Sequence, residues 1–230
     1  MSTAYIVDYL RSPFTPAYRG ALAGTRPDDL VAGVIKALVD RSGVDPAEIE
    51  DVNLGCAFPE GEQGLNIARC AALIAGLPQS VGGSTVNRWC GSSMQAIQMA
   101  AGAIAMGAGD VFVAGGVENM SRVPMMGFNP MPNPGWSDVQ RLAFLNMGLT
   151  AENLADRYSL SREEQDAYSL ESQKKALAAR ADGRLAAEIA PVGDVTADGC
   201  PRETDAAKLA GLKTAFKAGG SVTAGNSSPL

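Results

Sequence analysis

The chain contains no histidine, and none of its four cysteines forms a Cys-x-x-Cys pair. Structural zinc sites use these residues as ligands, so we expect no metal centre. There is no cluster of lysine and arginine, and the net charge of −6 argues against a nucleic-acid partner. The N-terminal residues lack the charged region of a secretory signal, and cysteines without an evident pairing pattern fit a reducing, cytoplasmic compartment.

Charged residues are also absent from positions 90–109. A membrane-spanning helix needs ~20 mostly apolar residues, whereas serine, glutamine and glycine interrupt this run. The pattern favours a helix buried inside a protein and no membrane span. Because its residues are apolar or small on every side, the helix should be covered all round, as it would be between two sheets. A second half of the molecule is therefore implied.

The rest of the composition is that of a globular protein, with 46% hydrophobic and 19% charged residues. The length suits one large domain, or one domain with a sizeable insertion. Apolar, β-prone runs predict strands at 4–9, 51–58, 81–87 and 110–118. Helical periodicity predicts a helix that starts at Thr25 or Pro27 and ends before Gly43, and further helices over 64–77 and 91–107. This alternation predicts an α/β fold with a largely parallel sheet and right-handed crossovers.

The character of the sequence changes after residue 118. Methionine, proline, asparagine and glycine dominate the next stretch, which predicts irregular structure. Two helices are expected at 150–158 and 161–183, the second with a capping box between Ser161 and Glu164. Residues 119–225 therefore have the character of an insertion.

One cysteine stands at a predicted strand-to-helix turn, Cys90 in "NRWCGSS". Free backbone N–H groups at a helix start favour a thiolate, and the small residues that follow would let a carbonyl approach. The residues alone leave open whether Cys90 is a nucleophile or a small packing residue. We expect Cys56 and Cys70 to be core or near-core thiols and Cys200 to be an exposed loop residue.

Four segments together resemble the thiolase family: "VNRWCGSSMQAIQMAAGAI", "VFVAGGVENMSRVPM", "NMGLTAENLADRYSLSREEQDAYSLESQKKA" and "VTAGNSSPL". They follow the family's order and extend over essentially the whole chain. The resemblance implies the layered αβαβα thiolase fold, present here as an N-terminal half with an inserted loop domain. It implies an N-terminal core at 1–118, a coenzyme A-binding loop insertion at 119–225, and the start of a return to the core at 226–230.

The resemblance also implies an activity. Thiolases are acyltransferases that cleave a 3-ketoacyl-CoA with coenzyme A, giving acetyl-CoA and a shortened acyl-CoA through an acyl-cysteine. The motif assigns that cysteine to Cys90, whose backbone N–H would help to hold the thioester oxygen. Coenzyme A would be a co-substrate, and no covalently bound cofactor is implied. The glycines of "VAGGVENM" would be backbone-permissive positions near the site.

Relatives bind coenzyme A along the insertion, and the matching positions here are Met147, Ala224, Gly225 and Ser228. Lys213, in "LKTAF", stands where the family has an arginine. Lysine keeps the charge but loses the planar fork, which alters the geometry of that contact. The methionines between 120 and 131 would line an acyl pocket or fill gaps in the packing.

The chain departs from the family pattern in two respects. It lacks the Gly-His-Pro segment with its catalytic histidine and the Cys-x-Gly-Gly-Gly segment with its second cysteine, and it stops at Leu230. We therefore expect an N-terminal piece of a thiolase. Its expected partners are acyl-CoA substrates, the C-terminal half of the same protein, further copies in a homodimer or homotetramer, and a β-oxidation hydratase/dehydrogenase subunit.

The form of the motif around Cys90 favours a degradative thiolase of fatty acid β-oxidation over a biosynthetic acetoacetyl-CoA thiolase. A ketoacyl synthase would share the fold and a cysteine turn, but would lack "MGLTAEN" and "VTAGN". A non-catalytic, thiolase-like acyl-CoA-binding protein is the third alternative. It would lack the histidine also in its C-terminal half.

Overall fold

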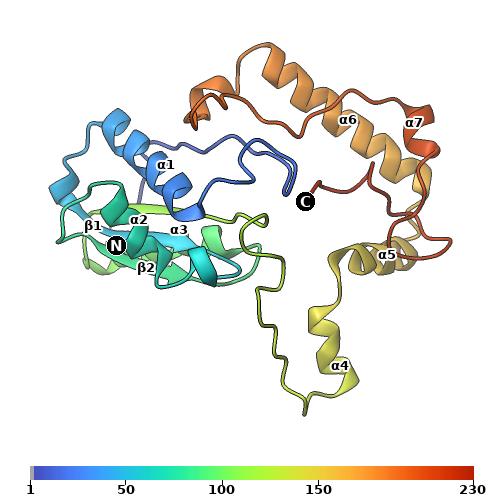
Figure 1. Ribbon diagram of the computed structural model, residues 1–230, viewed down its shortest axis with the longest axis horizontal. Coiled ribbons are helices and arrows are strands. Elements are labelled where there is room, and N and C mark those ends of the chain that lie inside the picture. Colours follow the sequence, from blue (N-terminus) through green and yellow to red (C-terminus); the bar gives the residue numbers. More distant parts are fainter. Residues whose placement is uncertain (1–2) are drawn as a thin grey trace. The chain divides into compact units, whose positions relative to one another are not determined.

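The computed structural model describes residues 3–230, which form two compact units (Figure 1). The first, which we call the sheet unit, comprises the chain up to Pro130 together with Glu188–Gly199. The second, the helical unit, comprises Met131–Ala187 and Cys200–Leu230. The domain boundaries expected from the sequence concern the family's fold and stay a prediction.

The sheet unit is built on three parallel strands, β1 (Ile49–Gly55), β2 (Gly82–Val86) and β3 (Val111–Gly116). Their order is β2-β1-β3, so the first strand is central. Three of the predicted strands are therefore confirmed, with ends that differ by a few residues. Because the strands are parallel, the loops that follow Gly55, Val86 and Gly116 meet at one edge.

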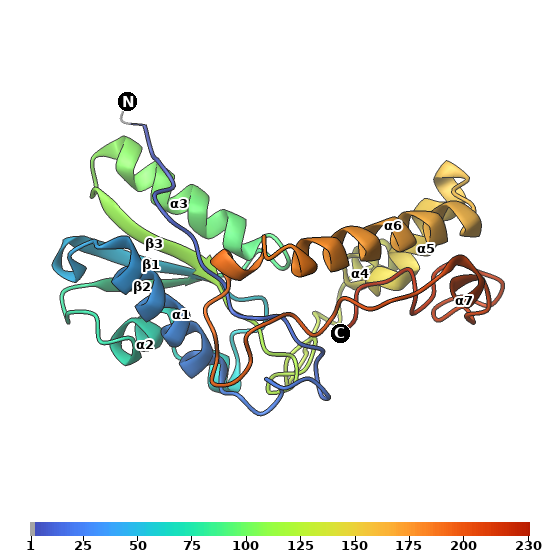
Figure 2. The same cartoon turned by 90° about the horizontal axis from the view of Figure 1, so that it is seen from above.

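Helices cover both faces of this sheet, with α1 (Pro27–Ser42) and α2 (Ile67–Ile74) on one side and α3 (Ser92–Met106) on the other (Figure 2). The start of α1 follows from Pro27 at the first position with Asp28 and Asp29 in the first turn. Its end follows from Gly43, which adopts a left-handed conformation with φ 69°. The apolar side chains of these elements form one core: Val31, Ile35, Val39, Ile49, Val52, Leu54, Ile67, Leu77 and Val81.

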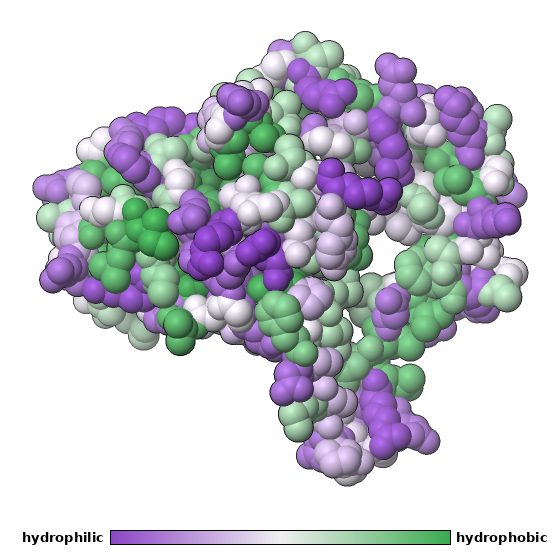
Figure 3. Space-filling model, viewed as in Figure 1, coloured by the Kyte–Doolittle hydropathy of each residue, from purple (hydrophilic) through white to green (hydrophobic). Residues whose placement is uncertain are grey.

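The α3 helix is covered on one face only by the described residues. Ser92, Ala96 and Ala100 are buried against the sheet, whereas Met94 and Met106 are 63% and 80% exposed. The small residues along the buried face allow the helix to lie close to the strands. The expectation that one half of the molecule cannot cover this helix is confirmed. On the face drawn in Figure 3, hydrophobic residues also reach the surface between hydrophilic ones.

The strand predicted at 4–9 is wrong. Residues 3–10 have no regular secondary structure, and Tyr5, Ile6 and Val7 are each more than three quarters exposed. A strand requires a neighbour that takes up its backbone hydrogen bonds, and β propensity alone does not supply one. Among residues 3–230, the nearest strand-like pairing along the chain is a single bridge between Arg11 and Ile189.

The helical unit contains α4 (Asp138–Arg141), α5 (Met147–Tyr158), α6 (Arg162–Ala181) and α7 (Ala206–Ala210). The predicted capping box of α6 is confirmed, because the Ser161 hydroxyl accepts from the Glu164 N–H and the Glu164 carboxylate accepts from the Ser161 N–H. The remaining chain is mostly turns and loops. Within the described part of the chain, no helix is both long and apolar enough to span a membrane.

Candidate active site

Cys90 lies on the turn between β2 and α3 and is exposed. The residue before it, Trp89, has a left-handed backbone with φ 51°, which is unfavourable for a bulky side chain. The Ser92 hydroxyl fixes this turn by accepting from the Arg88 N–H (2.8 Å) and donating to the Trp89 carbonyl (2.5 Å). Cys90 is thus held two residues before the first residue of α3, at the positive end of the helix dipole.

Two glycines at the strand ends let α3 begin at this position. A Cβ atom on Gly55 would overlap the backbone at Ser92 and Ser93, and one on Gly116 would overlap the Ser93 hydroxyl. Both glycines are therefore required by the close approach of the helix. We expected the glycines of "VAGGVENM" to be needed for a permissive backbone. Neither Gly115 nor Gly116 has a positive φ, so backbone conformation does not explain why glycine is present there.

The three other thiols differ from Cys90 in their surroundings. Cys56 is 1% exposed, and burial together with the nearby negative charge of Glu118 raises the pKa of its thiol to about 12. Its predicted place in the core is confirmed. Cys70 is partly buried, as expected for a near-core thiol. Cys200 lies in a loop, as expected, but it is partly buried, so the expectation that it is exposed is wrong.

A buried amide, Gln63, joins two of the loops at the carboxyl edge of the sheet. Its Nε2 group donates to the Phe58 carbonyl (2.8 Å) and to the Glu118 carboxylate (2.6 Å), and its Oε1 atom accepts from the Asn119 N–H (2.7 Å). The Glu118 carboxylate also accepts from the Ala57 N–H (2.7 Å). Sequence reasoning missed this cluster, because Gln63 lies 55 residues from Glu118 in the chain.

The predicted coenzyme A positions lie in the helical unit. Thr214 pairs with Thr223 in an antiparallel bridge, which places the exposed residues Lys213 and Ala224 on neighbouring segments. Gly225 is buried, and a Cβ atom there would approach Leu212 to 2.5 Å.

Two further predicted positions belong to other parts of the helical unit. Met147 is 64% exposed at the start of α5, and Ser228 is exposed near the end of the chain. The structure therefore brings Lys213, Ala224 and Gly225 together on neighbouring segments. It also places Gly148, the residue after Met147, against the Phe216 ring of the segment that carries Lys213.

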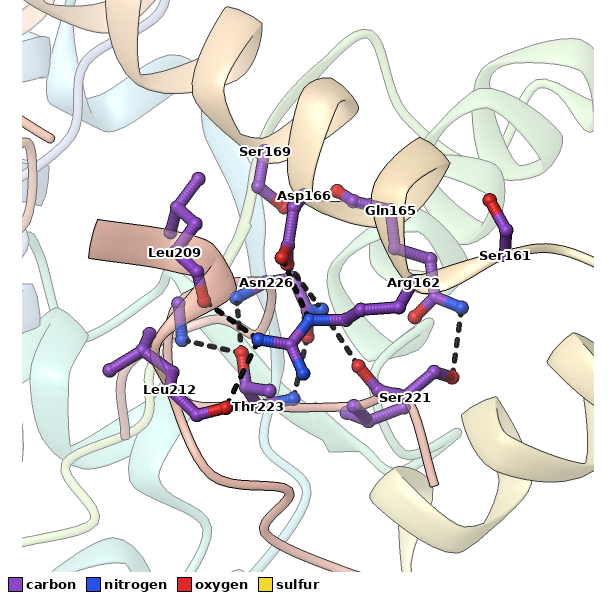
Figure 4. Close-up of polar contacts among 12 residues, drawn as sticks. Ser161, Arg162, Gln165, Asp166, Ser169, Leu209, Leu212, Ser221, Thr223 and Asn226 are labelled. Carbon is purple, nitrogen blue, oxygen red and sulfur yellow. Dashed lines mark hydrogen bonds and ion pairs between the residues drawn. The ribbon is translucent and has the colours of Figure 1, made fainter. Parts of the chain in front are cut away.

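Figure 4 shows a polar network that holds the segment 221–226 against α6. Arg162 donates to the Asp166 carboxylate (2.7 Å) and to the carbonyl oxygens of Leu209 (2.7 Å) and Leu212 (3.1 Å). The Asn226 amide donates to Asp166 (3.0 Å) and accepts from the Thr223 N–H (2.7 Å). This network fixes the turn that carries Ala224 and Gly225.

A second carboxylate, Glu152 of α5, holds the start of the same segment. It is 1% exposed and accepts from the N–H groups of Ser221 (2.9 Å) and Val222 (2.8 Å). Burial by itself raises the pKa of Glu152, but these hydrogen bonds outweigh it, and the net pKa is lowered. The only sequence signal for this role is an acidic residue on the buried face of α5, three positions before Ala155.

The site residues thus fall into two groups, with Cys90 in the sheet unit and the five coenzyme A positions in the helical unit. The residues around Cys90 can present a thiolate and backbone N–H groups to an electrophilic carbon. Within residues 3–230, no group of three potential metal ligands was found.

Comparison with known proteins relates this geometry to a family. The sequence model of the thiolase N-terminal domain matches residues 4–230. The 3-ketoacyl-CoA thiolase of Bacillus subtilis (strain 168) is 42% identical over 99% of the chain. The β-ketoadipyl-CoA thiolase of Escherichia coli is 44% identical over 99% of the chain. The crystal structure of the Bacillus anthracis acetyl-CoA acetyltransferase superimposes over 100% of the chain with a TM-score of 0.88 and 38% identity.

In each of these comparisons the chain covers only part of the relative. It spans 63% of the B. subtilis and E. coli sequences and 63% of the B. anthracis chain. The expected fold is confirmed as the mixed α/β fold of the thiolase N-terminal domain.

Proposed function

The chain belongs to the thiolase family, whose N-terminal domain it matches, and we propose that it supplies the acyl-accepting part of a 3-ketoacyl-CoA thiolase. The observation that carries the proposal is the exposed Cys90, held on a strained turn at the start of α3. The B. subtilis relative of that name is 42% identical to the chain. The remaining steps of the reaction would depend on groups supplied with the rest of the protein.

The proposed reaction begins with attack by the Cys90 thiolate on the 3-keto carbon of the substrate. The bond between C2 and C3 then breaks, its electron pair stays with the acetyl-CoA carbanion, and a proton completes acetyl-CoA. The acyl group remains on sulfur as a thioester. A coenzyme A thiolate attacks this thioester, releases Cys90 and forms the shortened acyl-CoA. Dividing the transfer in this way replaces one difficult step with two easier ones.

Two features of the chain support these steps. The Cys90 N–H, just ahead of the positive end of the α3 dipole, would stabilise negative charge that develops on the acyl oxygen. No histidine is available in this chain to protonate the carbanion. We therefore assign the acid and base to residues outside it, in the C-terminal half that the family's pattern supplies.

Coenzyme A is proposed to bind along the helical unit as a co-substrate, near Met147, Lys213, Ala224, Gly225 and Ser228. The exposed Lys213 ammonium group would attract a phosphate of the nucleotide. The segment 221–226, fixed by Asp166 and Glu152, would offer its backbone to the ligand. The methionines between 120 and 131 are proposed to contact the acyl chain.

The physiological role that we propose is fatty acid β-oxidation in the cytoplasm, by a homodimer or homotetramer. The assembly would include the C-terminal half and would work with a hydratase/dehydrogenase subunit. The alternative is acetoacetyl-CoA synthesis, which is favoured by the similarity to a protein named acetyl-CoA acetyltransferase. Initial rates with acetoacetyl-CoA and with a longer 3-ketoacyl-CoA distinguish the two roles.

The test of the proposed activity compares the chain alone with the chain joined to the remaining C-terminal part of the B. subtilis relative. Cleavage of 3-ketoacyl-CoA is measured in excess coenzyme A. We expect turnover only with the joined protein, and loss of that turnover in Cys90→Ala. Robust cleavage by the chain alone would show that the missing groups are not essential. Unchanged turnover in Cys90→Ala would overturn the proposed nucleophile.

A further inference from the structure

We propose that Gln63 is a positioning residue for Cys90, acting through Phe58 and Trp89 to hold the turn on which the thiol lies. The inference rests on the proposed role of Cys90 as the nucleophile. The Trp89 backbone, directly before Cys90, is strained, with φ 51°. Such a conformation in a bulky residue persists only where the surrounding structure enforces it. Neighbouring residues must therefore hold Trp89 in this conformation.

The segment 56–58, just after β1, contacts this turn at two points. The Asn87 amide donates to the Ala57 carbonyl (2.9 Å) and accepts from the Trp89 N–H (2.9 Å). The Phe58 ring packs edge-on against the Trp89 ring, with centroids 5.7 Å apart and an interplanar angle of 73°. Aromatic pairs prefer this edge-to-face arrangement. The Trp89 side chain therefore contacts 56–58 directly, and its backbone is linked to this segment through Asn87, in addition to its hydrogen bond from the Ser92 hydroxyl.

The segment 56–58 lies outside the strand and is itself fixed by Gln63. The Gln63 amide donates to the Phe58 carbonyl (2.8 Å) and contacts the Cys56 thiol (3.5 Å). Through Glu118 it also fixes the N–H of Ala57. Gln63 is fully buried, so its hydrogen bonds cannot be replaced by water without opening the site. No other residue of the described chain joins this segment to both Glu118 and Asn119 through its side chain.

These contacts form a continuous path from Gln63 to the turn before Cys90. If the path is broken, the Phe58 carbonyl keeps only its hydrogen bond from the Glu60 N–H. The Trp89 backbone can then relax toward a negative φ, and the thiol moves away from the N-terminus of α3. A thiol displaced from the N-terminus of α3 is expected to react more slowly with an electrophile. A role confined to stabilising the core would lower stability and leave the reactivity of Cys90 unchanged.

The test uses Gln63→Met, which keeps the length of the side chain and removes its polar atoms. The rate of Cys90 alkylation by iodoacetamide is measured by peptide mapping, with Cys70 of the same molecules as the internal reference. We expect the Cys90 rate to fall about tenfold and the Cys70 rate to change less than about twofold. In a Trp136→Phe background, the near-ultraviolet circular dichroism of Trp89 should decrease, because its contact with Phe58 becomes mobile.

The matched control is Asn53→Leu. Asn53 is also a buried amide, 3% exposed, but its side chain accepts from Ser84 on β2 instead of binding the segment 56–58. We expect this variant to lose stability while Cys90 keeps its alkylation rate. Should Gln63→Met fail to fold, Phe58→Leu takes its place. It removes the ring contact with Trp89 and keeps the carbonyl that Gln63 binds, and the same slowing of Cys90 is expected.

The outcomes separate this inference from the proposed function. If Cys90 of the unaltered chain reacts no faster than Cys70, the proposed nucleophile is wrong. The positioning role is wrong if Cys90 reacts fastest in the unaltered chain but a folded Gln63→Met variant leaves both its alkylation rate and the circular dichroism of Trp89 unchanged. The same result in Phe58→Leu, when that variant replaces Gln63→Met, has the same meaning. Slowing in Asn53→Leu equal to that in the test variant would also overturn it, because loss of stability would then be sufficient.

Discussion

The Arg162 guanidinium binds three acceptors at once, the Asp166 carboxylate and the carbonyl oxygens of Leu209 and Leu212 (Figure 4). A lysine ammonium group at the same position cannot match this planar arrangement. We expect Arg162→Lys to lower the free energy of unfolding by about 1–3 kcal/mol, because a partly buried acceptor loses its partner. Urea denaturation measures the change.

The matched control for this substitution is Arg184→Lys. Arg184 pairs with Asp182 at an exposed position, where its side chain is 68% exposed. Exposed ion pairs contribute little to stability, so a change below about 0.5 kcal/mol is expected. Equal losses in the two variants would mean that the Arg162 network does not stabilise the segment 221–226.

Glu152 gives the helical unit a predictable pH dependence. Its folded-state pKa is lowered from the ordinary value of 4.5, so its stabilising contribution is fully present above about pH 4.5. That contribution is lost as the pH falls through the folded-state pKa, where the carboxylate becomes protonated. Glu152→Gln should therefore be less stable than the unaltered chain at pH 7, and the difference should shrink below pH 4.5.

Thermal melts of both proteins between pH 3 and pH 7 measure this effect. The exposed residue Glu171 of α6 supplies the control variant Glu171→Gln, for which we expect little change at any pH. A stability difference between Glu152→Gln and the unaltered chain that persists undiminished at the lowest pH would contradict the account. It would show that the amide destabilises for a reason other than the lost charge.

At the scale of elements, the start of α3 depends on the absence of a side chain at Gly55. A Cβ atom there would overlap the backbone at Ser92 and Ser93. We expect Gly55→Ala to destabilise the sheet unit by at least about 2 kcal/mol and to slow the alkylation of Cys90. Gly102, within the same helix, serves as the comparison, because a Cβ atom added there would meet no neighbouring atom within 4 Å.

Alanine at Gly102 should stabilise α3 by about 0.5–1 kcal/mol, because alanine is the better helix former. Chemical denaturation of the two variants gives the comparison. If Gly55→Ala were as stable as Gly102→Ala, the close approach of α3 to β1 would not be a requirement of the fold.

The elements that the sequence predicts well are those in which local signals and packing agree. Pro27 and Gly43 delimit α1, and Ser161 with Glu164 begins α6. Residues 4–9 have strong β propensity, yet they form no strand. A strand also requires a neighbouring strand with which it can form backbone hydrogen bonds. Local sequence carries no information about that neighbour.

The sequence predicts some residues of the candidate site but not others. Cys90 stands out because a cysteine at a helix start has a chemical consequence that can be read locally. Nothing in the sequence predicts the positive φ of Trp89, which depends on contacts with Asn87, Ser92 and Phe58. Gln63 was missed because its partners are distant in the chain. Long-range polar contacts of this kind follow from the fold, and a single sequence without relatives does not specify them.

At the scale of the whole molecule, the exposed side of α3 governs behaviour in solution. Met94, Ile97, Met99 and Met106 are all exposed in the described chain. Leaving about 300 Å² of apolar area exposed to water costs about 7.5 kcal/mol of free energy, which is comparable to the net stability of a domain. Large apolar patches mark surfaces that interact or aggregate. We therefore expect the chain alone to associate with itself.

Light scattering of the chain alone, and of the chain co-expressed with the C-terminal part of the B. subtilis relative, measures this association. We expect a polydisperse sample for the first and a defined homo-oligomer for the second. A monodisperse monomer with a sharp cooperative melt, unaffected by the added part, would contradict the expectation that α3 requires a covering partner.

The central claim is that Cys90 is the reactive thiol of the molecule, and competition among the four cysteines tests it directly. The folded chain is treated with limiting iodoacetamide at neutral pH, and the adducts are quantified by peptide mapping. We predict that Cys90 is labelled first and that Cys56 is labelled last, because Cys56 is buried and its pKa is raised to about 12. Faster labelling of Cys56, Cys70 or Cys200 than of Cys90 would contradict the claim.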